Sequence, residues 1–419
     1  MSGLVQRPGL ILFCLAILVG SVAALRADVT PDMVTPVSVV AIIAIVLGEQ
    51  LPLRIAGRVI APLTTAPALG LILSPLSFGG EAPSAWTVMA VVWLSILAGG
   101  LVARARGLSV VEGSLGSRFL GMVVTTLIAR GVVSDGQTLV EWAFDESTRS
   151  ALGALGLLLA AVVGGLVERG LDNVVVWLAE RGGWRQVVAA EVGPLAGISA
   201  ATVATGPLIA LASPVLGWAA TPLLTLPVLL SYLSVQRVVA TRQALDEAVV
   251  ALSRFSEIAG LTRVGHVQRV ADLSVAIGRE MGADVVTLRA IERTALLHDV
   301  GQLGLREQLR GGATIHASTV EEATMARSVA RVIAGTPQLA ELTPYLDQVR
   351  TPFRRTREFG EHIPLPSRIV RVANAWDDIT EGAVSGRAQA VALERLHLGL
   401  GYDYDPEVVT ALERAVVSR

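Results

Sequence analysis

The chain has 419 residues, of which 52% are hydrophobic and only 17% are charged, and its mean hydropathy is +0.60. Soluble globular proteins carry about 25% charged residues, so this composition excludes a disordered chain and argues against a purely soluble one. The formal net charge is −2. Because proteins that bind nucleic acids usually carry an excess of basic residues, we expect no nucleic-acid partner. The single cysteine, Cys14, excludes a disulfide framework and a cysteine-rich metal site.

Apolar residues dominate up to about residue 236, and charged residues become dense beyond it. A helix that crosses the hydrocarbon core of a bilayer needs roughly 20 mostly apolar residues, because every backbone polar group must be paired within the segment. The sequence therefore predicts a polytopic helical membrane domain over 1–236, with the lipid bilayer as its partner. Eight segments qualify as spans: 9–25, 34–53, 59–77, 85–103, 117–134, 150–167, 193–212 and 216–235.

The arginines indicate which loops face the cytoplasm. If the N-terminus is cytoplasmic and the spans alternate, the outer side holds only Arg26, Arg149 and, at a span end, Arg130. The inner side then holds Arg7, Arg54, Arg58, Arg104, Arg106, Arg118, Arg169, Arg181, Arg185 and Arg237. This asymmetry follows the positive-inside rule, and we expect a multi-pass protein of the bacterial inner membrane with both termini in the cytoplasm. Segment 9–25 has an alternative interpretation as a signal peptide.

Ionisable residues of the predicted spans lie almost entirely at segment ends. Since a proton relay or an ion path would need such residues inside the membrane, we expect an anchor or a sensor rather than a transporter. The stretch 168–191 surrounds a short apolar group, 174–178, with charged residues, and it predicts an interfacial amphipathic helix.

Residues 237–260 form a predicted helical connector with heptad spacing. Val238, Leu245 and Leu252 share one heptad position, whereas Ala248 and Phe255 share another. Such spacing favours a coiled-coil seam, which would make the chain a homodimer that passes membrane signals onward. The alternative is an amphipathic first helix that packs on the core of its own domain, and about three heptads do not decide between the two.

Residues 261–419 predict an all-α domain, because no convincing alternation of a β-strand occurs there. Asp405 with Pro406 and Glu407 is typical of a helix start, and Gly282 and Gly301 stand where helices should end. The expected helices are 266–282, 284–300, 318–335, 338–348, 366–380, 386–398 and 405–416.

The adjacent pair His298-Asp299 is the first candidate for chemistry. It follows the apolar stretch 294–297, and a polar pair at the end of a buried helix costs free energy unless it is satisfied. Metal ligation satisfies both side chains, because imidazole and carboxylate are good ligands for a divalent ion. An isolated His-Asp dipeptide is nevertheless weak evidence, since most such pairs are surface residues or helix ends.

The motifs around this pair resemble the HD phosphohydrolase superfamily, and most closely its HD-GYP branch, the cyclic di-GMP phosphodiesterases. The resemblance covers about 261–415. Its motifs are His266-x-x-Arg-Val, the His298-Asp299 pair, the segment 363–369 and the terminal stretch 404–409. It implies a metal site that contains His266, His298 and Asp299, with His298 and Asp299 as the central catalytic pair and a nucleotide second messenger as substrate.

The chain also departs from the pattern of that family. Asn374 stands where a later aspartate ligand is expected, and Gln302 replaces a lysine. A middle histidine is missing from 326–329, paired histidines are replaced by 351–353, and 354–361 stands where the Gly-Tyr-Pro loop is expected. The domain therefore resembles a degenerate HD-GYP domain.

These losses change the expected chemistry. A two-metal centre needs many ligands around a shared water, so we expect one ion of the iron, manganese or magnesium class, or none. His266, His298 and Asp299 would hold it, and Asn374 would offer a neutral oxygen. Asp377 or Asp378 could substitute, because each lies about one helical turn from Asn374.

The remaining histidines and a basic run carry weaker signals. His316 and His397 lack partner spacing and are expected to be structural, whereas His362 could approach the site. Arg350, Arg354, Arg355 and Arg357 form either a solvated loop or a phosphate-binding group, for which the planar guanidinium is suited.

Two functions follow from these observations. The first is a membrane-bound signalling protein whose soluble domain, 261–419, hydrolyses a phosphoester bond of a nucleotide as a metal-dependent phosphohydrolase. The second is a catalytically inactive regulator or interaction module that the membrane domain controls.

Overall fold

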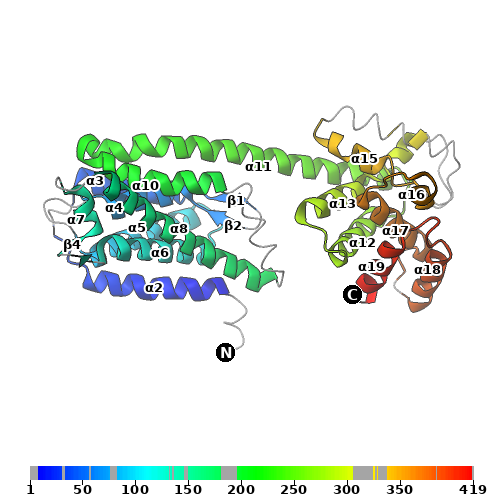
Figure 1. Ribbon diagram of the computed structural model, residues 1–419, viewed down its shortest axis with the longest axis horizontal. Helices are drawn as coiled ribbons and strands as arrows, with labels where there is room; N and C mark the ends of the chain where they lie inside the picture. Colours follow the sequence, from blue (N-terminus) through cyan, green and yellow to red (C-terminus); the bar gives the residue numbers. More distant parts are fainter. Residues whose placement is uncertain are drawn as a thin grey trace. The chain divides into compact units, whose positions relative to one another are not determined.

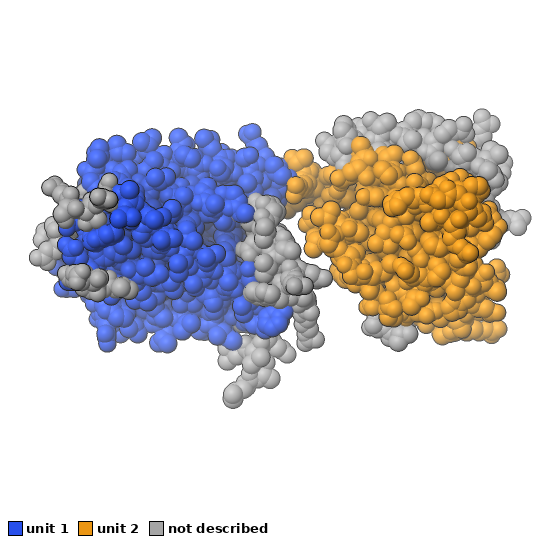
Figure 2. Space-filling model, in the orientation of Figure 1, with its two compact units in different colours: residues 1–239 blue, residues 240–419 orange. Residues whose placement is uncertain are grey.

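The computed structural model describes residues 8–30, 34–55, 58–75, 83–131, 133–134, 136–145, 150–180, 196–304, 324–325, 328, 337–383 and 385–417. The chain divides into two compact units, Met1–Val239 and Ala240–Arg419 (Figure 2). Helix α11 (Ala220–Ile258) contributes residues to both. The described residues are mostly helical, as the sequence predicted, and the strands among them form two short antiparallel hairpins.

Helices pack side by side in the first unit (Figure 1). Its first half contains α2 (Pro8–Arg26), α3 (Pro36–Gly48), β1 (Leu53–Ile55), β2 (Arg58–Ile60), α4 (Pro62–Leu73), α5 (Ala85–Ala105) and α6 (Glu112–Thr126). Its second half contains the π-helix η2 (Leu127–Gly131), β3 (Val133–Ser134), β4 (Gln137–Thr138), α7 (Leu139–Phe144), α8 (Ser150–Glu180), α10 (Ala196–Leu216), the 3-10 turn η3 (Gly217–Ala219) and the start of α11.

The prediction of eight spans is wrong in number. Among the described residues, four helical stretches are long and apolar enough to cross a membrane: Pro8–Arg26, Ala85–Ala105, Ala151–Leu178 and Ala196–Phe255. The last contains η3 and so merges two predicted spans. The predicted interfacial helix at 168–191 is, as far as residue 180, the continuation of α8, and 181–191 lie outside the described residues.

Two of the predicted spans are half-length helices. The apolar stretches 34–53 and 59–77 contain α3 with 13 residues and α4 with 12. At 1.5 Å per residue each is about 20 Å long, well short of the roughly 30 Å of hydrocarbon. Pro52 follows α3 and Pro62 is the first residue of α4, so both helices are bounded by proline. The β1–β2 hairpin joins them, with Leu53 opposite Ile60.

All 12 residues of α4 are buried. The helix packs between α3 and α10, and Gly70 gives α10 close access, because a Cβ there would lie 2.6 Å from a methyl group of Ile209. Protein side chains, rather than solvent or lipid, therefore surround α4.

Three ionisable residues at or near the ends of the predicted spans 34–53 and 117–134 are buried inside this unit. Arg118, 1% exposed, forms a buried ion pair with Glu49 at the end of α3. Arg130 donates hydrogen bonds to the carbonyl oxygens of Ile72 (2.7 Å) and Ser74 (2.6 Å), where α4 ends. The Arg130 contacts satisfy carbonyl groups that the end of α4 leaves free. Arg130 therefore fixes the end of α4, and Arg118 fixes the end of α3 through Glu49.

The second unit is all-α, as predicted. After the last part of α11 it contains α12 (His266–Glu280), α13 (Val285–Leu297), η4 (Val300–Gly304), η7 (Pro337–Leu342), α15 (Thr343–Leu346), α16 (Arg354–Phe359), α17 (Leu365–Thr380), α18 (Gly386–Leu398) and α19 (Pro406–Val417). The predicted helix 338–348 is a 3-10 turn followed by one helical turn. Most of the predicted helix 318–335 lies outside the described residues.

Helices α12, α13, α17 and α19 surround one apolar core. Val270, Ile291, Val372 and Leu412, one from each helix, are fully buried in it. The helices begin as the sequence indicated. The backbone N–H of Thr287 donates to Asp284 at 2.8 Å, and the backbone N–H of Glu407 donates to Asp405 at 2.9 Å, which stabilises the first turns of α13 and α19.

The connector is helical, and one of its apolar faces packs on this core. Val249 is buried there, and Leu245 and Leu252 lie against it. This packing matches the expectation of a first helix that belongs to its own domain. Phe255 and Ile258 remain 53% and 80% exposed, so pairing of two copies along that other face stays a prediction.

Candidate metal centre

The four predicted site residues lie on or next to three helices, α12, α13 and α17. His266 is the first residue of α12 and follows Gly265, whose positive φ of 75° turns the chain into the helix. His298 caps the end of α13, and Asp299 follows it. Asn374 lies in the middle of α17. All four side chains are buried, between 1% and 7% exposed.

The structure brings their polar atoms together. Asp299 Oδ2 lies 3.2 Å from His266 Nε2 and 3.1 Å from His298 Nε2. Asn374 Oδ1 lies 3.0 Å from the same His298 Nε2. The ligand atoms of the two histidines and the aspartate all lie within 4.8 Å of one another. Two imidazole nitrogens, one carboxylate and one amide oxygen therefore face a common point.

The opposite nitrogen of each imidazole is fixed by a second contact. His266 Nδ1 donates to Asp377 Oδ2 at 2.7 Å, and His298 Nδ1 donates to the carbonyl oxygen of Ala295 at 2.6 Å. Metal-bound histidines are commonly held in this way by a carboxylate or a backbone carbonyl. In the neutral form of each ring, a proton on Nδ1 leaves the lone pair of Nε2 directed at the common point, so an ion that binds there takes the place of the Nε2 proton.

The acid behind His266 is itself held in place. Arg269 donates two hydrogen bonds to Asp377, from Nε at 2.7 Å and from Nη2 at 2.9 Å. This bidentate pair fixes the plane of the carboxylate. Asp377 and Arg269 therefore orient His266 from behind and do not face the common point.

Asp299 provides the test of whether an ion fits. The residue is 1% exposed, and among the described residues neither of its carboxylate oxygens accepts a hydrogen bond, nor does His266 Nε2 form one. Buried polar atoms are normally satisfied. A divalent cation bound by Asp299 and the two imidazoles would satisfy these atoms, and the nitrogen and oxygen donors suit such an ion.

The electrostatics of the group favour a cation. Burial opposes ionisation of Asp299, but the imidazoles of His298 and His266 outweigh it and hold the pKa of the carboxyl well below its usual value. Burial likewise lowers the pKa of His266, whereas its close contacts with the carboxylates of Asp299 and Asp377 raise it more, to about 10. An ionised carboxylate between two imidazoles thus favours positive charge at its centre.

The remaining predicted substitute for the missing aspartate is Asp378. Its Oδ2 accepts a hydrogen bond from Asn374 Nδ2 at 3.4 Å, and burial raises its pKa to about 6. It therefore lies beside Asn374. The sequence grouped Asp377 with Asp378, and the contact of Asp377 with His266, 111 residues earlier, was the feature that sequence reasoning missed.

The basic run has mixed contacts. Arg350 Nη2 donates to the carbonyl oxygen of His298 at 3.2 Å, so it supports the backbone of the site. Arg354 lies over the ring of Tyr402, and Arg355 pairs with Glu361. Neither interpretation, a solvated loop or a phosphate-binding group, describes all of these arginines. Arg350 supports the backbone of the site, and Arg354 and Arg355 already contact Tyr402 and Glu361.

The other histidines do not join the centre. His362 is exposed, and His397 pairs with Glu413 at 2.7 Å on the surface. His316 lies outside the described residues.

No family model, no curated protein and no solved structure matches this chain. Its function is therefore inferred from the geometry of its own residues.

Proposed function

We propose that this chain is a membrane-bound signalling protein whose second unit is a metal-dependent phosphohydrolase for a phosphoester bond of a nucleotide-type substrate. The observation that supports this most is the convergence of His266 Nε2, His298 Nε2 and Asp299 Oδ2 on one point. Both imidazoles have their Nδ1 atoms fixed from behind, as in metal sites that are pre-organised for an ion.

Each residue of the centre has a distinct part in this proposal. His266, His298 and Asp299 hold one ion of the iron, manganese or magnesium class, and Asn374 offers a neutral oxygen. Such an ion, when bound, polarises a phosphate and lowers the pKa of a water molecule. Arg269 and Asp377 keep His266 oriented, while Arg350 holds the backbone of His298. His298 and Asp299 are therefore the residues on which catalysis depends most.

A second candidate is a catalytically inactive regulator. It is favoured by Asn374, because a neutral amide attracts a dication less strongly than the carboxylate that the HD resemblance implies. Among the described residues, His266, His298 and Asp299 are the only buried group of histidine and carboxylate ligands with this spacing. In this case the HD-like unit keeps its fold and serves as a binding module.

Metal content and turnover separate the two candidates. The full chain, purified in detergent, is analysed for bound metal and for hydrolysis of bis-p-nitrophenyl phosphate with added Mn²⁺. We expect about one ion per chain in the wild type. His298→Ala and Asp299→Ala should lose the ion, whereas the surface control His397→Ala should keep it. Turnover that disappears in Asp299→Ala supports the hydrolase. Bound metal without turnover of any phosphodiester supports the regulator, and no metal above the level of His298→Ala removes the hydrolase.

A further inference from the structure

A second cavity, in the first unit, is separate from the metal centre. It has a volume of about 250 Å³ and lies between α8, α10 and the β2–α4 segment. Aliphatic side chains of α8 and α10 form much of its wall, including Val162, Leu166 and Val203. Polar side chains at the same cavity come mainly from Glu168, Arg169 and Ser199. The cavity is therefore amphipathic.

The polar part of this cavity contains unsatisfied donors. Arg169 Nη1 and Ser199 Oγ are buried, and neither has a hydrogen-bond partner among the described residues. The nearest counter-charge, Glu168 Oε1, lies 3.9 Å from the other terminal nitrogen of Arg169, beyond hydrogen-bond distance. A guanidinium N–H and a hydroxyl that lack acceptors at one cavity indicate a ligand with acceptor oxygens.

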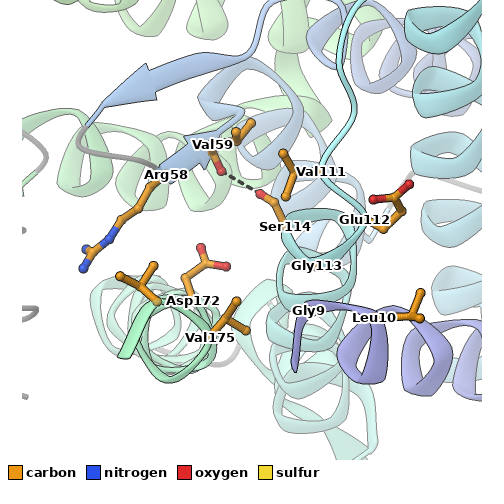
Figure 3. A pocket seen from close by; sticks show the side chains of 11 residues that line it. Gly9, Leu10, Arg58, Val59, Val111, Glu112, Gly113, Ser114, Asp172 and Val175 are labelled. Carbon is orange, nitrogen blue, oxygen red and sulfur yellow. Dashed lines mark hydrogen bonds between the residues drawn. The ribbon is translucent and has the colours of Figure 1, made fainter. Parts of the chain in front are cut away.

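A neighbouring cavity of the same unit provides a contrast. It has a volume of about 310 Å³ and is lined by residues of α2, β2, α6 and α8 (Figure 3). There Ser114 donates to the carbonyl oxygen of Val59 at 2.6 Å, Asp172 accepts from Ser117, and Glu112 pairs with Arg104. Ser114, Asp172 and Glu112 each have a protein partner, so none of these three side chains calls for a ligand.

The position of Arg169 along α8 identifies the source of the acceptor. The candidate span begins at Ala151, and 18 residues at 1.5 Å per residue place Arg169 about 27 Å along it. The hydrocarbon core is about 30 Å thick, so a membrane whose hydrocarbon begins at Ala151 would place Arg169 near the level at which lipid phosphates begin. Leu166 is 67% exposed beside it, and Val162 is 36% exposed, which leaves an apolar surface for an acyl chain.

We propose that this cavity binds the head group of a phospholipid that carries a primary ammonium group. Arg169 and Ser199 donate to the phosphate oxygens, and the buried carboxylate of Glu168 accepts from the ammonium. The first methylene groups lie against Val162, Leu166 and Val203. This inference rests on insertion of the first unit in a membrane, which is part of the proposed function.

Binding of short-chain lipids to the full chain tests the assignment. Dihexanoyl phosphatidylethanolamine is titrated into delipidated protein in detergent, in parallel with dihexanoyl phosphatidylcholine, dihexanoyl phosphatidylglycerol and inorganic phosphate. We expect the ethanolamine lipid to bind at least tenfold more tightly than the others. Arg169→Ala should weaken its binding at least tenfold, whereas the exposed control Arg104→Ala should leave it unchanged. Ala200→Phe, which fills the mouth of the cavity from an exposed position, should also block it.

Several results would overturn the proposal. Equal binding by the wild type and Ala200→Phe excludes the cavity, and this variant decides the matter if Arg169→Ala does not fold. Phosphate that binds as tightly as the lipid indicates a small-anion site instead, and a preference for the choline or glycerol lipid refutes the role of Glu168. Recovery of the chain in the soluble fraction refutes membrane insertion, while metal content at His298 reports separately on the phosphohydrolase.

Discussion

Replacing Asp377 by asparagine tests whether the support behind His266 controls metal binding. The carboxylate accepts three hydrogen bonds, from His266 Nδ1 at 2.7 Å, Arg269 Nε at 2.7 Å and Arg269 Nη2 at 2.9 Å. Asparagine keeps one acceptor oxygen and places an NH₂ group against a donor. His266 then loses its fixed orientation or Arg269 loses its bidentate partner.

The loss should appear as weaker metal affinity with the ligands intact. Removing the outer partner of a metal-bound histidine typically costs 10- to 100-fold in affinity, which is about 1.4–2.8 kcal/mol. Competition with a chromogenic chelator measures the Mn²⁺ affinity of the full chain in detergent. Asp272→Asn, an exposed change on the same helix α12, is the control and should stay within twofold of the wild type. If Asp377→Asn also stays within twofold, Asp377 does not orient a metal ligand and the reasoning fails.

Three further predictions concern stability, assembly and topology. Ile291→Ala should destabilise the second unit by about 2–5 kcal/mol, since it leaves a cavity in the core. Val286→Ala on the same helix, 76% exposed, should change the denaturation midpoint little. Phe255→Asp should convert a dimer to a monomer in light scattering without lowering the thermal midpoint, and a wild-type monomer would remove the dimeric connector. Alkaline phosphatase fused after residue 419 should be inactive and a fluorescent protein bright if the C-terminus is cytoplasmic; active phosphatase would reverse the orientation.

Local signals in the sequence predicted the second unit well. The cap at Asp405 and the amphipathic pattern of apolar residues depend on near neighbours, and the helices begin close to the predicted residues. The group of His266, His298 and Asp299 also assembles as expected. The division of roles on α17 could not be read, because Asn374, Asp377 and Asp378 share one helix face and only tertiary packing decides which of them meets His266.

The first unit was harder to predict, because hydropathy averages over a window and does not show where a helix ends. The stretches around Pro52 and Pro62 were apolar enough for spans, although each holds a helix of only 13 or 12 residues. Arg118 was counted only as a charge at the start of the span 117–134, and its pairing with Glu49 was not predicted, since Glu49 lies 69 residues away in the sequence. Contacts of that range follow from the packed structure rather than from local pattern.

The complete burial of α4 has a consequence for the order in which the chain is assembled. A 12-residue helix cannot be inserted as a span of its own, so α4 must wait for the helices that enclose it. Helix α10, which packs on it, begins about 120 residues later, and at roughly 5–20 residues per second it emerges some 6–25 s after α4. During that interval the face of α4 that α10 covers has no partner from α10, and this is the period in which we expect misfolding to compete with assembly.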